Sequence, residues 1–183
     1  MPERILGRQE EIDQQLEEDF SGLVSKLRRY DMNKVMRLYC KLRLPDNRRR
    51  TYKRVKQAVE SSGIRVVESH VSFEGLSMGG VILIDEDMDS RKRTIVLVHE
   101  WAHELLGHPA ILRQHPSQRR DPFHSLVREI QAESVSYVVC RYLGIDNPYT
   151  QGSLLIRDVG PRFLKANKDE ILQTSRVMVG ELE

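Results

Sequence analysis

The chain has 183 residues and a net charge of +2, with 39% hydrophobic and 31% charged residues. This length suits one globular domain, which would bury roughly 70% of its unfolded-chain surface and needs no disulfide staples. No apolar run approaches 18 residues and the first twenty residues are acidic, so we expect neither a membrane span nor a secretory signal.

The two cysteines, Cys40 and Cys140, lie far apart in the chain, and neither has a metal-ligand spacing such as CxxC. This pattern argues against a disulfide framework and against a cysteine-based zinc site. Reduced thiols are typical of the cytoplasm, which is the location that we expect. Composition and spacing indicate no oligomeric state.

The first sixty residues predict helices. Apolar residues recur at helical spacing over residues 12–27, and Asp31 is a candidate cap of a second, short helix. A third helix is predicted to begin at Asp46 or Asn47 and to end near Gly63. We therefore expect a helical N-terminal extension over residues 1–63 and a second domain over residues 64–183.

A basic segment over residues 48–56 is the candidate nucleic-acid contact. Residues 1–20 carry two basic and seven acidic side chains, whereas residues 26–56 carry thirteen basic and two acidic ones. Neutralisation of phosphates by such a block gives salt-dependent affinity for nucleic acid. The alternative is a solvated helix face packed against the acidic N-terminal helix. The candidate contacts are Arg48, Arg49, Arg50, Lys53 and Arg54.

From residue 64 onward the pattern changes. β-Branched residues predict two strands, over 64–71 and 80–85. The second is either a sheet edge that pairs with an extended peptide or an ordinary core strand, and the sequence leaves both open. A helix over 91–106 follows, with Asp89 or Ser90 as its cap and Gly107 as its stop signal.

The remaining segments complete an α+β domain. A polar loop with three prolines is predicted after Gly107, and Asp121-Pro122 opens a helix over residues 123–143. A last helix covers residues 167–182.

Two histidines of the 91–106 helix stand four residues apart in the sequence His99-Glu100-Trp101-Ala102-His103. At this spacing both imidazoles lie on one helix face and can bind one ion, and neutral imidazole is a good zinc ligand. Glu100 projects toward the open coordination position, where it can take a proton from water whose pKa the metal lowers to about 7. We expect one zinc per chain and Glu100 as general base.

A third ligand is needed, and the next helix offers two glutamates on one face, Glu129 and Glu133. A metzincin-type histidine is excluded, because Leu106 and Pro109 occupy the positions where that pattern has glycine and histidine. We expect Glu129 as the ligand and Glu133 as an outer acceptor that fixes the tautomer of an imidazole. The reverse assignment is left open.

The stretches TIVLVHEWAHELLGH (residues 94–108) and REIQAESVSYVVCRYLGID (residues 128–146) resemble the small gluzincin-like zincins of bacteria, in particular ImmA/IrrE-type metallopeptidases and the metallopeptidase domain of plasmid antirestriction proteins. The resemblance implies a zincin-like metallopeptidase core and an activity in regulatory proteolysis or antirestriction. It implies His99, His103 and Glu129 as zinc ligands and Glu100 as the base.

Three hypotheses follow. The first is a zinc-dependent endopeptidase that hydrolyses peptide bonds of a protein substrate. The second is a non-catalytic zincin scaffold that binds DNA or a regulatory protein. The third is a structural zinc, for which His108 or Glu133 would supply a fourth ligand. The residue that stabilises the oxyanion of the first hypothesis is left unassigned among Tyr137, His108, His115, His124 and Tyr149.

Overall fold

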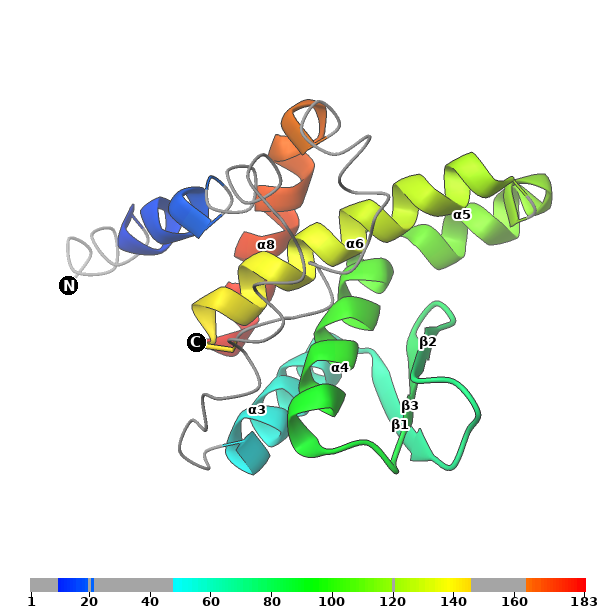
Figure 1. The fold of residues 1–183 in the computed structure, drawn as a ribbon, viewed down its shortest axis with the longest axis horizontal. Coiled ribbons are helices and arrows are strands. Elements are labelled where there is room, and N and C mark those ends of the chain that lie inside the picture. The colour runs from blue at the N-terminus through cyan, green and yellow to red at the C-terminus, as the bar shows by residue number, and fades with distance from the viewer. Residues whose placement is uncertain (1–9, 20, 22–47, 120, 146–163) are drawn as a thin grey trace, which may run out of the picture.

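The computed structural model describes residues 10–19, 21, 48–119, 121–145 and 164–183 (Figure 1). Its architecture is α+β, as predicted, and mostly helical, with a small mixed sheet. No helix of these described residues is long and apolar enough to cross a bilayer. After a helix within residues 10–19, the elements are α3 (Arg48–Ser61), β1 (Arg65–Ser69), β2 (Gly75–Ser77), β3 (Val81–Asp85), α4 (Ser90–Leu105), α5 (His108–Gln114), the 3₁₀ helix η1 (Pro116–Arg119), α6 (Pro122–Tyr142) and α8 (Lys168–Leu182).

The sheet has the strand order β1-β3-β2, with β1 parallel and β2 antiparallel to β3. The two predicted strands correspond to β1 and β3. Of the two alternatives for residues 80–85, a sheet edge or an ordinary core strand, the structure has the core strand, because β3 is paired on both sides. The edge strands are β1 and β2, and β2 has three residues and a glycine start that hides it from a search for β-branched runs.

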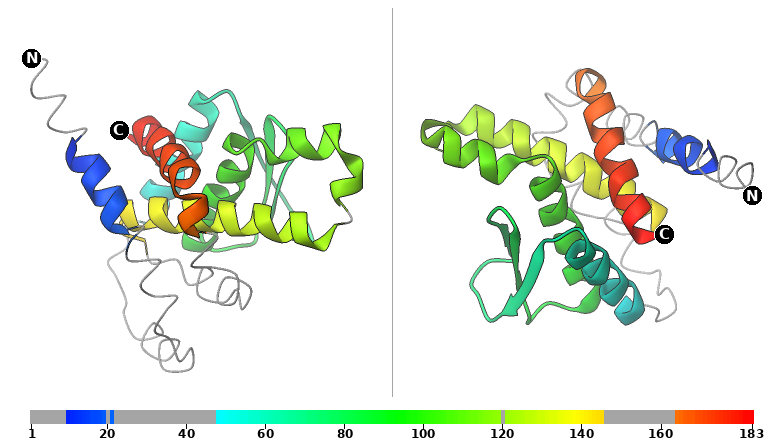
Figure 2. Two further views of the ribbon diagram at one scale, coloured as in Figure 1. Left: turned by 90° about the horizontal axis from the view of Figure 1, so that it is seen from above. Right: turned by 180° about the vertical axis from the view of Figure 1, so that it is seen from behind.

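Helix α4 runs through the middle of the described structure, between the sheet and the other helices (Figure 2). Its start is set by Asp89, whose carboxylate accepts hydrogen bonds from the backbone N–H groups of Arg91 (2.8 Å) and Lys92 (3.0 Å). Gly107 follows its end with φ of 70°, a left-handed conformation that glycine adopts without strain. Both predicted signals are thereby confirmed.

The segment after α4 is helical, so the prediction of a polar loop there is wrong. Pro109 lies in the first turn of α5, where a missing backbone N–H costs nothing, and the chain continues through η1 into α6. Asp121 caps α6 as predicted, accepting from the backbone N–H of Phe123 at 2.9 Å. The segment α5, η1 and the start of α6 projects to one side as an arm (Figures 1 and 2).

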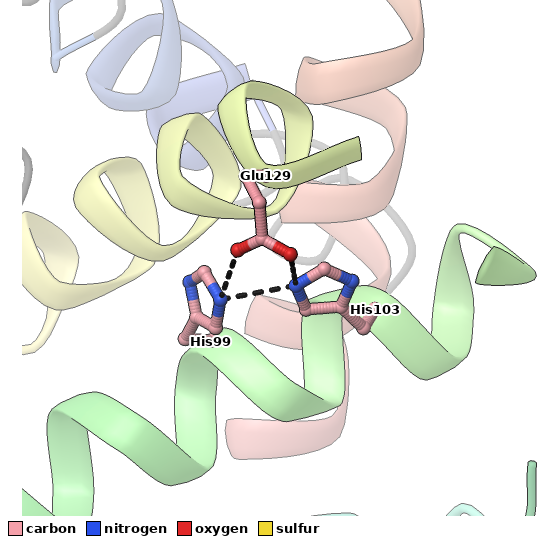
Figure 3. A group of neighbouring side chains, drawn as sticks. All are labelled: His99, His103 and Glu129. Carbon is pink, nitrogen blue, oxygen red and sulfur yellow. Dashed lines mark hydrogen bonds and ion pairs between the residues drawn. The ribbon is translucent and has the colours of Figure 1, made fainter. Parts of the chain in front are cut away.

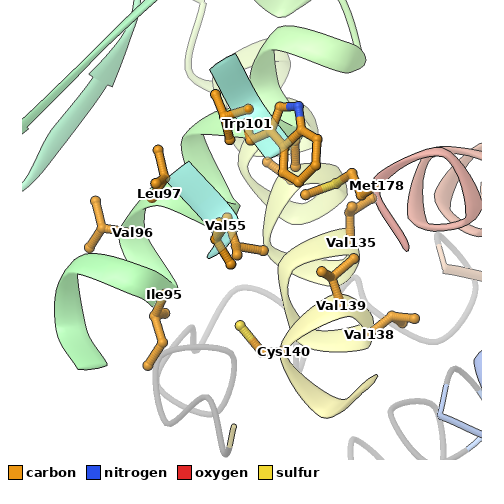
Figure 4. Close-up of a cluster of buried hydrophobic side chains, with 14 of the residues drawn as sticks. Val55, Ile95, Val96, Leu97, Trp101, Val135, Val138, Val139, Cys140 and Met178 are labelled. Atoms are coloured by element: carbon orange, nitrogen blue, oxygen red, sulfur yellow. The ribbon is translucent and has the colours of Figure 1, made fainter. Parts of the chain in front are cut away.

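The hydrophobic core lies where α3, α4, α6 and α8 meet (Figure 4). Val55 of α3, Trp101 of α4, Val135 of α6 and Met178 of α8 are all fully buried there. Helix α3, assigned from the sequence to the N-terminal extension, therefore shares its core with the elements that follow it. A domain boundary at residue 63 stays a prediction.

The acidic helix within residues 10–19 is bound by α6 and α8. Three of its acidic side chains form ion pairs with residues of these two helices: Asp13–Arg176 (2.7 Å), Glu17–Lys168 (2.7 Å) and Asp19–Arg141 (3.6 Å). Packing of the basic segment against this helix stays a prediction.

Candidate metal centre

The imidazoles of His99 and His103, both on α4, turn their Nε2 atoms toward each other. Their Nε2 atoms lie 3.0 Å apart, and their ring centroids are 4.7 Å apart, as expected for positions one helical turn apart. His103 is buried and His99 is partly exposed. The pair lies at the floor of a cleft, with the core of the protein on the other side of the helix.

The third donor is the carboxylate of Glu129, which α6 places over both imidazoles (Figure 3). Its two oxygens lie 3.4 Å from His99 Nε2 and 3.5 Å from His103 Nε2. Ala132, fully buried on α6, leaves room for the two helices to approach. The residues that the sequence assigned as ligands are thus brought together.

The spacing of these three donors fits a small divalent cation. Bonds of about 2.0–2.1 Å in a tetrahedral site place the ligand atoms about 3.3 Å apart. The three observed separations lie between 3.0 and 3.5 Å. Two imidazole nitrogens and one carboxylate oxygen are also the donor chemistry that zinc takes in proteins with an open fourth position. Among the described residues, these three form the group that could hold a metal ion.

The charges of the site favour binding of a cation. Burial opposes ionisation of Glu129, but hydrogen bonds from His103 and His99 outweigh it and hold the pKa of this carboxyl far below its usual range. Burial likewise disfavours protonation of His99, yet the hydrogen bond to Glu129 and the charge of Glu100 raise its pKa. A cation at this spot would therefore meet an ionised carboxylate.

Glu100 lies beside His99 and borders the same cleft. Burial raises its pKa, and a hydrogen bond from the backbone of Ser77 in β2 acts in the opposite direction. The contact is close because β2 has a glycine there: a Cβ on Gly75 would lie 2.6 Å from Val96 Cγ1 and 2.9 Å from Glu100 Cγ. Glycine at this position therefore allows the edge strand to approach the base.

The cleft has a volume of about 690 Å³ and is lined by β2, α4, α5 and α6. Edge strand β2 forms one wall. Backbone hydrogen bonds join Met78 to Val81 and Glu74 to Asp85, so residues 74, 76 and 78 bond to β3. In an antiparallel pair the intervening residues, Gly75 and Ser77, turn their N–H and C=O groups outward. The cleft therefore runs along a sheet edge.

Two side chains hold the tip of the β2–β3 hairpin, and the sequence pattern predicts a role for neither. The carboxylate of Glu104 accepts hydrogen bonds from the backbone N–H groups of Gly79 and Gly80, both at 2.7 Å. Arg113 of α5 donates to the carbonyl of Met78 at 2.9 Å. Glu104 follows His103 directly in the chain, so the helix that carries the histidines also positions the edge strand.

The other ring nitrogen of His103 has a partner that the sequence pattern does not predict. Its Nδ1 lies 2.8 Å from Nδ1 of His108, and Nε2 of His108 lies 3.3 Å from Oε1 of Gln131. Burial and the neighbouring charge of His103 lower the pKa of His108 to about 4. A sequence signal exists in hindsight: Gly107 turns the chain so that a histidine five residues after His103 folds back onto it.

Glu133 lies one turn after Glu129 and borders a smaller pocket of about 220 Å³ with Glu74, His99 and Glu100. Burial raises its pKa to about 7, and the charge of Glu129 adds to this effect, while the charge of His99 opposes it. The expected acceptor role of Glu133 toward an imidazole stays a prediction. At His103, the observed neighbour of the second ring nitrogen is His108.

The basic segment is partly engaged by the protein itself. Arg54 donates two hydrogen bonds, of 3.0 and 2.7 Å, to the carbonyl of Leu182 near the end of α8. Arg50 and Lys53 are exposed on α3. The side chains of Arg48 and Arg49 lie outside the described residues.

The remaining candidates lie away from the three metal donors or outside the described part. His115 and His124 are exposed, Tyr137 is buried, and Tyr149 and Cys40 lie outside the described residues. Cys140 is buried, and this burial raises the pKa of its thiol to about 12, which leaves no thiolate for nucleophilic chemistry.

Comparisons with known proteins add no relative. A scan against models of protein families, a search of curated proteins and a search of solved structures each returned no match to this chain. The function must therefore be inferred from the chemistry of the site.

Proposed function

We propose that the protein is a zinc-dependent endopeptidase of the zincin type, acting on a protein substrate in the cytoplasm. His99, His103 and Glu129 hold one zinc, and Glu100 is the general base. The observation that carries this proposal is the convergence of two Nε2 atoms and one carboxylate, 3.0–3.5 Å apart, in a cleft that Glu100 shares. The resemblance to ImmA/IrrE-type metallopeptidases supports the same assignment.

Zinc bound by these three residues supplies a Lewis acid that polarises a carbonyl and makes water acidic. The carboxylate of Glu100 then accepts a proton from the water that attacks the scissile carbonyl carbon, and passes it to the nitrogen of the leaving amine. Its burial beside His99 supports this role, because a carboxyl whose pKa is raised can hold the proton between the two steps.

The position of β2 supports a peptide as substrate. Gly75 turns its N–H and C=O groups and Ser77 its C=O group outward along the cleft, while the Ser77 N–H is bonded to Glu100. An extended chain can add to such an edge by main-chain hydrogen bonds. The exposed side chains of Leu76 and Met78 lie on the same wall and offer apolar contacts to the substrate. The edge strand thus favours an extended segment with apolar side chains.

A purely structural zinc would require a fourth protein ligand. His108 is a poor candidate, because its ring nitrogens face His103 Nδ1 and Gln131 rather than the three donors. Glu133 is not part of the described group of donor atoms that lie within 4.8 Å of one another. Within the part of the chain that the structure describes, no fourth side chain joins this group, which supports the catalytic alternative.

The test compares Glu100→Gln with wild type and with Glu181→Gln, a matched change at an exposed position of α8. The measurements are zinc content and cleavage of unfolded protein and peptide-library substrates. We expect Glu100→Gln to keep zinc and to lose at least about 1,000-fold in cleavage rate, since the base is removed but the ligands remain. Glu181→Gln should cleave like wild type.

Unchanged cleavage by Glu100→Gln would contradict the mechanism. The non-catalytic alternative rests on the exposed basic residues of α3, and Arg50→Glu with Lys53→Glu tests it. If wild type cleaves nothing but binds DNA, and this double variant abolishes DNA binding, the scaffold acts as a binding protein instead.

A further inference from the structure

We propose that His108, Gln131 and Glu170 form a directional hydrogen-bond relay that fixes His103 as the tautomer able to bind metal through Nε2. His108 and Gln131 are positioning residues in this account, because neither reaches the three donor atoms. The inference rests on the proposed function to the extent that His103 is taken as a metal ligand.

The relay and the ligand that it orients form a continuous series of contacts across four helices. From α4, His103 Nδ1 meets His108 Nδ1 of α5 at 2.8 Å. His108 Nε2 meets Gln131 Oε1 of α6 at 3.3 Å. Gln131 Nε2 donates to Glu170 Oε2 of α8 at 2.7 Å. The first three residues are buried, with 8%, 3% and 8% of their surfaces exposed.

Burial makes the protein partners decisive, because buried polar atoms without a partner are costly. Because these three side chains are nearly excluded from solvent, the hydrogen-bond directions inside the relay are set by its own members.

The donor and acceptor at each step of the relay follow from Glu170, at the end away from the metal donors. An ionised carboxylate only accepts hydrogen bonds, so Glu170 requires the NH₂ group of Gln131 to face it. The second N–H of that group points to Asn167 Oδ1 at 3.3 Å, which agrees with this orientation. The carbonyl oxygen of Gln131 therefore faces His108, whose Nε2 must carry a proton and donate it.

The same logic continues to the metal centre. Two ring nitrogens 2.8 Å apart share one proton, and a neutral His108 that donates from Nε2 has a lone pair at Nδ1. His103 must then carry its proton on Nδ1. With Nδ1 bonded to His108, Nε2 is the ring nitrogen that faces His99 and Glu129 and is left to bind a metal. The relay thus selects the metal-binding tautomer of His103.

Two isosteric variants separate this role from simple packing. In His108→Asn, the side-chain amide takes the place of Nδ1 and can still accept from His103. In His108→Gln, it reaches the place of Nε2 and keeps the contact to Gln131 while losing His103. Both variants lose the imidazole, so a purely structural role predicts the same effect for both.

The readout is the dissociation constant for zinc, measured by competition with a chelator. We expect His108→Asn to bind within about threefold of wild type and His108→Gln to bind about 10- to 100-fold more weakly, the range found for lost outer partners of metal ligands. Thermal unfolding of the metal-free variants serves as a control, and we expect similar midpoints for the two.

Equal zinc affinity of the two variants would overturn the relay. A wild-type protein that binds no zinc would instead overturn the proposed function. Imidazole nitrogen NMR of the metal-free wild type tests the relay independently of metal and of variants: we expect a proton on Nε2 of His108 and on Nδ1 of His103. The opposite tautomers would contradict the proposal even if both variants failed to fold.

Discussion

Helix α4 has two different faces, one apolar and buried in the core, the other polar and bordering the cleft. On the core face, Leu97 and Trp101 are fully buried among side chains of α3, α6 and α8 (Figure 4). On the cleft face, His99, Glu100 and His103 each meet a polar group from another element. The core face sets where the helix lies, and the cleft face determines what it can bind.

This difference separates stability from function. Apolar burial is non-directional, so the core face contributes free energy of folding without specifying chemistry. The cleft face brings a carboxylate and two imidazoles together, an arrangement that contributes little to folding and requires protons or a cation to balance its charge. Changes on the two faces should therefore have different consequences.

Trp101→Ala should have the largest effect on stability. Removal of a fully buried indole leaves a cavity and should lower the free energy of unfolding by about 3–5 kcal/mol. Trp101→Phe should cost less, because among the described residues the buried indole N–H has no hydrogen-bond partner to lose. Urea unfolding of the metal-free proteins measures both. Equal losses for the two variants would contradict this reading of the core face.

Glu129→Gln and Glu133→Gln make a matched pair on the cleft side. We expect Glu129→Gln to weaken zinc binding at least about 100-fold, because a ligand is lost, and Glu133→Gln to weaken it less than about tenfold. Isothermal titration with zinc gives both values. The reverse order would show that Glu133 is the ligand, the assignment that the sequence left open.

Ionisation of Glu133 should make the stability of the metal-free protein depend on pH. The pKa of Glu133 is raised to about 7 in the folded state, above its value in an unfolded chain. The stability that this group contributes is therefore full at acidic pH and is lost as the pH rises through 7. Glu133→Gln should be more stable than wild type by about 1–3 kcal/mol at pH 8 and equal to it at pH 4.

Urea unfolding at the two pH values measures this difference. An advantage of Glu133→Gln that is the same at both pH values would exclude the titration of Glu133 as its cause. A disadvantage at pH 8 would mean that the ionised carboxylate is stabilised in the folded protein.

The fold was predictable from sequence where a local signal exists. Asp89 and Asp121 cap helices, and Gly107 ends one, because each acts on neighbouring backbone groups. The predictions of local structure failed where a residue type is compatible with more than one conformation. Pro109 indicates a loop as readily as a first helical turn, and Gly75 conceals a strand that depends on its contact with α4.

The site divides in the same way. His99 and His103 share a helix, so their spacing alone predicts that they meet, and Glu129 required only the expectation of a second helix. The partners of His103 could not be predicted, because Gln131 lies 23 residues after His108 and Glu170 a further 39 residues along. Their contacts depend on how α5, α6 and α8 pack.

The most direct test of the account is the zinc content of the purified protein after equilibration with zinc and removal of the excess, for wild type and His99→Ala. The account predicts about one zinc per chain in wild type and little or none in the variant, with both proteins folded. A folded wild-type protein without zinc, or a variant that retains the metal, would contradict it.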